Sequence, residues 1–311
     1  GDLHKYRSLA VIMPRGHGKT VLTKADILRS FCFAEEPLFY GWVSATQKLA
    51  VGNMDYVKTH LEYNEKLKYY FGNSKGRKWT ETDIELANGC KLISKSNISG
   101  IRGGAKLHKR YDLVVLDDFE DENNTLTSES RSKNANMVTA VVAPALEPHD
   151  GRLRINGTPV HYDSFINNLI VNYEKAQSEN KDFSWRVMLY KAIDSKDNSL
   201  WPSWFPMDKL REKKKFYVDS GQPHKFYQEY MMEVQSAEDS IFNMRHVKYW
   251  DGFYKYEDDE QAGYICNDGD RTPVSIFAGV DPATDSERRD SDYSVIMVVA
   301  CDVNANVYVL D

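Results

Sequence analysis

The chain has 311 residues, of which 41% are hydrophobic and 28% are charged, and its formal net charge is −6. This length and composition predict one large domain and part of a second. No apolar run is long enough to span a membrane and no signal peptide is present, which predicts a soluble protein without membrane partners. Cys32, Cys90, Cys266 and Cys301 form no CxxC pair, which disfavours a zinc site and favours reduced thiols in a cytosol.

The negative net charge counts mildly against a nucleic-acid binder. Two runs of the chain are locally basic despite the negative net charge, and each is interpreted equally well as a solvated face or as a contact surface. They are Lys91, Lys95, Arg102, Lys106, Lys109 and Arg110, followed much later by Lys209, Arg211, Lys213, Lys214 and Lys215.

The first part of the chain alternates short apolar strand patterns with helical ones. We expect strands over residues 8–13, 39–45, 111–116, 152–156 and 184–190, helices over 21–33 and 47–70, and a hairpin over 79–94. Asn88-Gly89 is a typical hairpin turn. Strands that alternate with helices predict an α/β fold with a parallel sheet covered by helices on both faces.

The last part of the chain changes character. Residues 236–272 are acidic and lack helical periodicity, which predicts an irregular bridging segment. Three strands are then expected over 275–280, 293–301 and 307–310, forming an antiparallel meander. We therefore predict a first domain over 1–235, a linker over 236–273 and the start of a second domain over 274–311, with both ends cut from a longer chain.

A phosphate-binding loop is predicted between the first strand and the first helix. Such a loop needs small residues that turn backbone N–H groups inward, and a helix N-terminus behind them. The glycines allow the close approach, the lysine reaches the β- and γ-phosphates, and the threonine hydroxyl ligates Mg²⁺. The predicted ATP-binding residues are Pro14, Arg15, Gly16, His17, Gly18, Lys19 and Thr20.

Carboxylates follow a second buried strand. Asp117 and Asp118 come at the carboxyl end of the apolar run 113–116, where open α/β sheets bind their ligands. Asp117 is the expected Mg²⁺ ligand, directly or through water. Another carboxylate must activate the attacking water, and Asp118 is a candidate beside Glu120 and Glu122.

These residues resemble a known family, the large terminase subunits that package DNA in tailed double-stranded DNA bacteriophages. The phosphate loop has Met13 in place of the leading glycine and carries Arg15, as is characteristic of the family. Residues 99–103 (SGIRG), followed by 111–118, resemble its arginine-glycine loop and its Walker B strand. Residues 156–159 (NGTP) resemble its coupling motif, and residues 279–283 (GVDPA) with 291–295 (SDYSV) resemble the opening of its nuclease domain.

The resemblance implies an ASCE-type P-loop NTPase followed by the first strands of an RNase H-like nuclease. It implies that Thr158 lies in the loop that senses the γ-phosphate. Arg15 in its own subunit or Arg102 in a neighbour's site is a candidate arginine finger, and Arg102 is interpreted equally well as a surface or DNA-phosphate contact. Asp281 and Asp292 would belong to a two-metal nuclease site for Mg²⁺ or Mn²⁺, whose other carboxylates fall beyond residue 311.

The implied activity is ATP hydrolysis that drives viral double-stranded DNA into a procapsid. The implied partners are DNA gripped without sequence reading, the portal protein, the small terminase subunit and other copies of the chain in a ring, all in the host cytoplasm. Two alternatives remain open at this stage. One is a helicase-like DNA translocase, and the other is an ATP-switched assembly or binding protein with little turnover.

Overall fold

A computed structural model of the chain describes residues 6–96, 101, 109–234, 250–267, 269–281 and 295–310. The chain divides into two compact units, residues 1–241 and 242–311, and each unit holds one sheet. Within the described ranges no helix has the length and apolar character needed to cross a membrane. Cys32, Cys90, Cys266 and Cys301 are free thiols.

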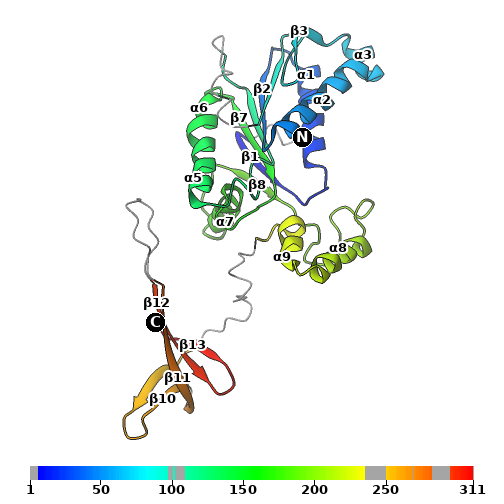
Figure 1. Ribbon diagram of the computed structural model, residues 1–311. Coiled ribbons are helices and arrows are strands. Elements are labelled where there is room, and N and C mark those ends of the chain that lie inside the picture. Colours follow the sequence, from blue (N-terminus) through cyan, green and yellow to red (C-terminus); the bar gives the residue numbers. More distant parts are fainter. Residues whose placement is uncertain are drawn as a thin grey trace. The chain divides into compact units, whose positions relative to one another are not determined.

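The first unit is built on an eight-stranded sheet in the order β3-β4-β5-β2-β6-β7-β1-β8 (Figure 1). The six strands from β5 to β8 in this order run parallel, while β3 and β4 are antiparallel at one edge. The bounds are β1 Ser8–Ile12, β2 Phe39–Ser44, β3 Lys75–Trp79, β4 Asp83–Leu86, β5 Lys91–Lys95, β6 Leu113–Asp117, β7 Arg152–Gly157 and β8 Arg186–Leu189.

Both faces of this sheet are buried, because its central strands are apolar on both sides. On β2, Tyr40 and Trp42 pack into one core cluster and Phe39 and Val43 into the other. The first cluster lies under α1 (Lys19–Cys32) and α2 (Gln47–Tyr63). The second lies under α5 (Ser128–Met137), the π-helical turn η2 (Val138–Val142), α6 (Ala143–Ala145) and α7 (Phe165–Ser178), on the opposite face in Figure 1. The predicted parallel sheet covered on both faces is confirmed.

Two details at the edge of the sheet differ from the prediction. The helix expected over 47–70 is two helices, α2 and α3 (Glu65–Phe71), because Asn64 ends the first and caps the second. The Asn64 side chain accepts hydrogen bonds from the backbone N–H groups of Lys66 and Leu67. The hairpin is formed by β4 and β5 with Gly89 at its turn, as predicted, whereas β3 was not expected.

A small helical subdomain follows β8 and was not predicted. It consists of α8 (Met207–Asp219), α9 (Pro223–Phe226) and the π-helical turn η3 (Tyr227–Met231). Leu210, Phe226 and Tyr230 form its buried centre, and Phe226 and Tyr230 stack with ring centroids 5.2 Å apart. We call residues 191–231 the aromatic segment.

The second unit is a five-stranded antiparallel sheet in the order β13-β12-β11-β10-β9. Its strands are β9 Phe253–Glu257, β10 Ala262–Asn267, β11 Asp270–Asp281, β12 Val295–Asp302 and β13 Val307–Val309. The antiparallel meander expected here is present. The expectation of an irregular segment over 236–272 is wrong for its described part, because β9 and β10 pair with each other and β10 pairs with β11. The Tyr254 ring packs against Gly263, where a Cβ would lie 2.6 Å from the tyrosine hydroxyl.

Candidate nucleotide site

The loop after β1 turns sharply into α1. Gly16 and Gly18 have φ angles of +76° and +85°, a region that glycine adopts without the strain that a side chain would add. Gly18 is the N-cap of α1, and no side chain caps this helix. The first backbone N–H groups of a helix have no partner within the helix, so an uncapped N-terminus suits an anion. These features suit an anion such as phosphate.

Lys19 lies inside this loop. Its side chain is buried, and its Nζ donates a hydrogen bond of 2.8 Å to the backbone oxygen of Met13. Burial lowers the pKa of Lys19, while the carboxylates of Asp118, Asp117 and Glu229 oppose this effect. The amine is therefore held between the start of the loop and the acidic end of β6.

The strand order brings three loops to one edge of the sheet, because β7 lies between β1 and β6. Asp117, the buried last residue of β6, pairs in register with Asn156 of β7. The Asn156 amide donates to Asp117 Oδ1 (3.2 Å) and to the Thr23 hydroxyl of α1 (2.7 Å). Burial and the charge of Asp118 raise the pKa of Asp117 to about 6, although hydrogen bonds with Asn156 and Thr20 oppose the rise.

Asp118 differs from its neighbour in exposure and in backbone conformation. It is exposed, its φ is +46°, and its backbone N–H donates to the Asn156 carbonyl at 2.9 Å. A non-glycine residue in this region is strained, and such strain gathers at functional sites. The charge of the Asp118 carboxylate partly opposes the lowering of the Lys19 pKa by burial, and the carboxylate remains open to solvent.

Glu120, a candidate for activating the attacking water, contacts the start of α7 instead of the predicted phosphate loop. Its buried carboxylate accepts hydrogen bonds from the backbone N–H groups of Phe165 (2.9 Å) and Ile166 (3.0 Å). It therefore caps the N-terminus of α7. Glu122, the third candidate, is exposed and forms an ion pair with Lys225. Of the three carboxylates, Asp118 alone is adjacent to the phosphate loop.

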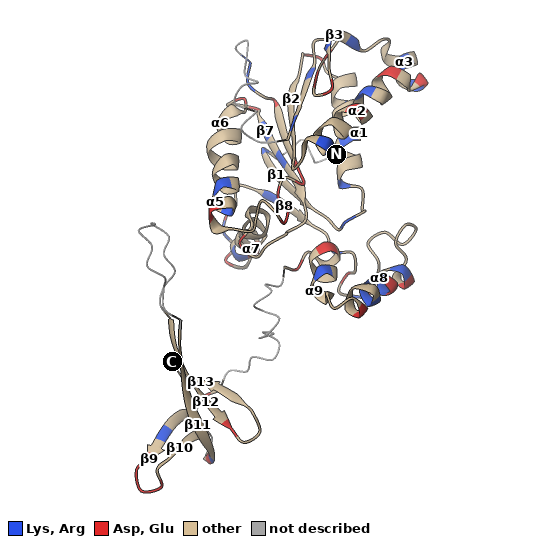
Figure 2. Ribbon diagram, in the orientation of Figure 1, with Lys and Arg blue, Asp and Glu red and all other residues tan. Residues whose placement is uncertain are grey.

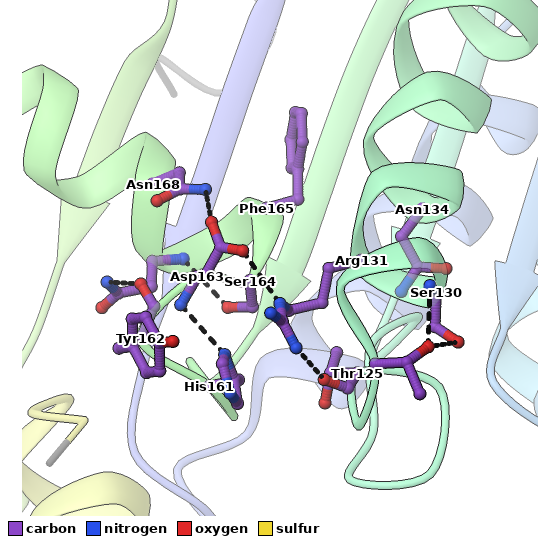
Figure 3. Close-up of polar contacts among 12 residues, drawn as sticks. Thr125, Ser130, Arg131, Asn134, His161, Tyr162, Asp163, Ser164, Phe165 and Asn168 are labelled. Carbon is purple, nitrogen blue, oxygen red and sulfur yellow. Dashed lines mark hydrogen bonds and ion pairs between the residues drawn. The ribbon is translucent and has the colours of Figure 1, made fainter. Parts of the chain in front are cut away.

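The loop after β7 is tied to the loop after β6 by a network of polar contacts (Figure 3). The Arg131 Nε of α5 bonds the Asp163 carboxylate at 2.9 Å, and its Nη1 bonds the Thr125 carbonyl at 3.0 Å. Asp163 also accepts from Asn168 at 3.1 Å. Thr158, at the start of this loop, is partly buried. Through Asp163 this loop therefore contacts both α5 and α7.

The aromatic segment packs on the phosphate loop. The His17 ring stacks on Phe205 with centroids 4.6 Å apart and planes at 14°. His17 Nδ1 is 3.0 Å from the Arg15 carbonyl, and burial lowers the pKa of its imidazole. The Arg15 guanidinium pairs with Glu229 of η3 at 3.2 Å. A Cβ on Gly16 would lie 3.1 Å from the Phe205 ring. The loop and the aromatic segment therefore constrain each other.

No protein-family model matches the sequence, and no curated protein matches it significantly. Among solved structures, the crystal structure of the HK97 bacteriophage large terminase is similar with a TM-score of 0.50 and 14% identity, covering 97% of this chain. The chain spans 58% of the length of that protein. The chain has the fold of a bacteriophage large terminase. This confirms, at the level of the fold, the terminase resemblance that the motifs predicted.

Two further terminase structures are similar. The ATPase domain of the Thermus phage P74-26 large terminase has a TM-score of 0.48 and 16% identity, covering 74% of this chain and 89% of that domain. The large terminase of a thermophilic bacteriophage, in complex with ATP-gamma-S, has a TM-score of 0.44 and 12% identity, covering 99% of this chain and 63% of that one.

Three predicted site residues of the terminase resemblance lie wholly or partly outside the described residues. Arg102 and Asp292 fall in ranges that the structure does not describe. Asp281 is the last residue of β11 and pairs in register with Val295, and its side chain is not described.

The donor set beside the predicted phosphate loop suits Mg²⁺. Thr20 and Asp117 offer a hydroxyl and a carboxylate that already share a hydrogen bond. Mg²⁺ in ATP sites takes one or two protein oxygen ligands and completes its shell with phosphates and water. In the described part of the chain, no three His, Cys, Asp or Glu side chains gather to hold a metal by themselves.

Sequence reasoning missed the part of the site that comes from the aromatic segment. Trp201, Phe205 and Glu229 contact the phosphate loop or lie beside it. The run WPSWF over 201–205 is a visible signal, because five residues with three large aromatic rings are unusual on a surface. It has no periodicity that would connect it with residues almost two hundred positions earlier.

Proposed function

We propose that this chain is the ATP-hydrolysing part of a motor that moves viral double-stranded DNA into a procapsid. The observation that carries the proposal is the meeting of Lys19, Asp117 and Asp118 at the end of a terminase-like sheet. A buried lysine, a buried carboxylate of raised pKa and a strained, exposed carboxylate surround one uncapped helix N-terminus.

In this proposal each residue has one task. The N–H groups of residues 16–20 and the Lys19 ammonium bind the β- and γ-phosphates, and Lys19 leaves the Met13 carbonyl to do so. Thr20 and Asp117 hold Mg²⁺, which supplies positive charge beside the phosphates. Asp118 accepts the proton of the attacking water. Arg15 within the chain, or Arg102 from a neighbouring copy, stabilises the charge that develops on the transferred phosphate.

The coupling of hydrolysis to movement is assigned to the β7 end. Asn156 hydrogen-bonds both Asp117 and α1, and the adjoining Thr158 loop connects to α5 and α7 through Asp163 and Glu120. Loss of the γ-phosphate would change the contacts of Thr158, and the loop would pass that change to these helices.

The further assignments are those of a complete terminase. The proposed partners are double-stranded DNA, the portal protein, the small terminase subunit and other copies of the chain in a ring, in the host cytoplasm. The second unit is proposed to begin an RNase H-like endonuclease in which Asp281 and Asp292 hold Mg²⁺ or Mn²⁺.

The first test is Lys19→Ala, with Lys175→Ala as a matched loss of an exposed lysine elsewhere in the unit. Steady-state ATP hydrolysis is measured with and without double-stranded DNA. We expect turnover to fall at least about 100-fold in Lys19→Ala and to be unchanged in the control. Unchanged turnover in Lys19→Ala would end the phosphate-loop assignment. Negligible wild-type turnover in both conditions, with tight nucleotide binding, would favour an ATP-switched binding protein instead.

A further inference from the structure

The segment from α3 to the end of β3 is strongly basic. Residues 65–79 contain five cationic side chains and one carboxylate, Glu65, in a chain whose formal net charge is −6. The five are Lys66, Lys68, Lys75, Arg77 and Lys78. We call these residues, together with Tyr69 and Tyr70, the α3–β3 surface. Figure 2 shows the Lys and Arg positions along α3 and β3 at the edge of the sheet.

All five cationic side chains are exposed. Lys66, Lys68 and Arg77 have no acidic side chain within ion-pair distance among the described residues. Lys75 and Lys78 pair with Glu62 and Asp83, yet both lysine side chains stay about half exposed, at 51% and 53%. Exposed pairs of this kind are weak and exchange readily for another anion. The surface therefore offers three positive charges that form no ion pair among the described residues, with one exposed acid, Glu65, at the start of the same helix.

Tyrosine side chains accompany these charges. Tyr69 and Tyr70 are 83% and 73% exposed and contact each other edge to face, with centroids 5.0 Å apart. Their hydroxyl groups are therefore free to donate to an external acceptor. Phosphate oxygens of nucleic acids take hydrogen bonds from tyrosine hydroxyls as well as from lysine and arginine.

Protection of a sheet edge is a second explanation for part of this charge. β3 is an edge strand, and lysine on an edge strand prevents pairing with other chains. This accounts for Lys75, Arg77 and Lys78. It does not account for Lys66 and Lys68, which lie on α3, nor for two exposed tyrosines, which would promote association with other apolar surfaces.

We propose that the α3–β3 surface binds the phosphate backbone of duplex DNA without reading its sequence. The choice of duplex DNA as ligand rests on the proposed function. Cations on a helix and on the neighbouring strand form a spread of point charges that matches a charged backbone, and lysine contacts to phosphate carry no sequence information.

The test is a variant that loses the three unpaired charges, Lys66→Gln, Lys68→Gln and Arg77→Gln. A matched control loses three exposed lysines elsewhere in the unit, Lys133→Gln, Lys175→Gln and Lys196→Gln. Binding of a short duplex of mixed sequence is followed by fluorescence anisotropy from about 50 to 200 mM salt. Each phosphate contact contributes about 0.9 to the slope of log K against log salt. We expect the slope to become less steep by roughly 2 to 3 in the variant and to stay unchanged in the control.

Thermal unfolding and basal ATP hydrolysis accompany the titration, because none of the three substituted residues belongs to the nucleotide site. Both should match the wild type. A variant that binds duplex with the wild-type affinity and slope overturns the surface assignment and leaves the proposed function in place. Equal losses in variant and control also overturn it, since the effect would then be net charge alone. If the wild type binds no duplex at any salt concentration, the surface assignment and the DNA partner of the proposed function fail together.

Discussion

Three carboxylates lie within four residues at the end of β6, and their surroundings differ. Asp117 and Asp118 lie beside Lys19, Thr20 and Asn156 at the phosphate loop. Glu120 is turned to the other side of the chain, where its oxygens accept two backbone N–H groups of α7. A carboxylate that already accepts two backbone donors at a helix N-terminus has a structural task. The first pair still has unused acceptor capacity, which suits it to a cation and a water.

The difference shows that one run of acidic residues at the end of a core strand holds both carboxylates suited to chemistry and a carboxylate that stabilises the fold. The backbone decides which is which. Asp118, with φ of +46°, separates Asp117, which contacts Asn156 and Thr20, from Glu120, which contacts the start of α7. Substitutions in the two sets should therefore separate chemistry from stability.

The largest expected effect belongs to Asp118→Asn. If Asp118 accepts the proton of the attacking water, turnover should fall by about 10²- to 10⁴-fold, while ATP affinity stays near that of the wild type. Steady-state hydrolysis and equilibrium binding of a fluorescent ATP analogue measure the two quantities. Glu122→Gln is the matched control, because Glu122 is an exposed acid a few residues away that pairs with Lys225. Full turnover in Asp118→Asn would refute this role.

Asp117→Asn should also lower turnover, and in addition it should stabilise the fold. Burial and Asp118 raise the pKa of Asp117 from its ordinary 3.8 to about 6. A buried carboxyl with a raised pKa destabilises the native state once it is ionised. At pH 7 this costs about 3 kcal/mol at most, which the asparagine variant avoids while keeping an oxygen that accepts from Asn156.

The pH dependence gives the sign of this effect. The native state holds the Asp117 proton more tightly than the unfolded state does, so wild-type stability relative to Asp117→Asn falls as pH rises from about 4 to about 6. The difference in unfolding free energy should be largest above pH 6 and should vanish below pH 4. Chemical denaturation at several pH values measures it. A variant that is less stable than the wild type at pH 7 would show that the carboxylate is better solvated than its burial indicates.

Glu120→Ala should have the opposite profile, with lost stability and retained chemistry. Removing the carboxylate leaves the N–H groups of Phe165 and Ile166 buried without their acceptor. We expect a loss of roughly 2 to 4 kcal/mol, seen as a lower midpoint in thermal unfolding. Turnover of the folded protein should remain within a few-fold of the wild type. A loss of turnover as large as that of Asp118→Asn, at a temperature where the variant is folded, would return Glu120 to the catalytic candidates.

The sequence predicts the parts of this molecule that depend on local patterns. The strands at β1, β2, β6 and β7, the glycine-dependent loop and the Gly89 turn all follow from short runs of residue types. Asn64 is a local signal too, but a cap inside a continuous apolar pattern is outweighed by the periodicity around it. The stacking of Phe205 on His17 and the capping of α7 by Glu120 depend on long-range packing, which periodicity does not contain.

The smallest expected effect concerns the contact that joins the two loops, the pair of Arg131 and Asp163. Burial raises the pKa of Asp163, but hydrogen bonds from Asn168 and Arg131 outweigh it and leave the pKa below its ordinary value. The pair therefore stabilises the fold above the ordinary aspartate pKa, and this contribution is lost as pH falls through the lowered one. Because the Asp163 side chain is 47% exposed, solvent screens it, and Asp163→Asn should cost about 1 kcal/mol or less at low salt.

Salt and pH series on Asp163→Asn decide whether this contact is electrostatic. At about 1 M salt the Debye length is near 3 Å, so the difference from the wild type should shrink, and it should also disappear at acidic pH. The asparagine of this variant could still accept from Arg131 through its side-chain oxygen, which isolates the charge from the hydrogen bond. A loss well above 1 kcal/mol that is insensitive to salt would mean that Asp163 holds the loop by geometry. In that case Asp163 in the network of Figure 3 would act through fixed hydrogen bonds, as Glu120 does, although its side chain is partly exposed.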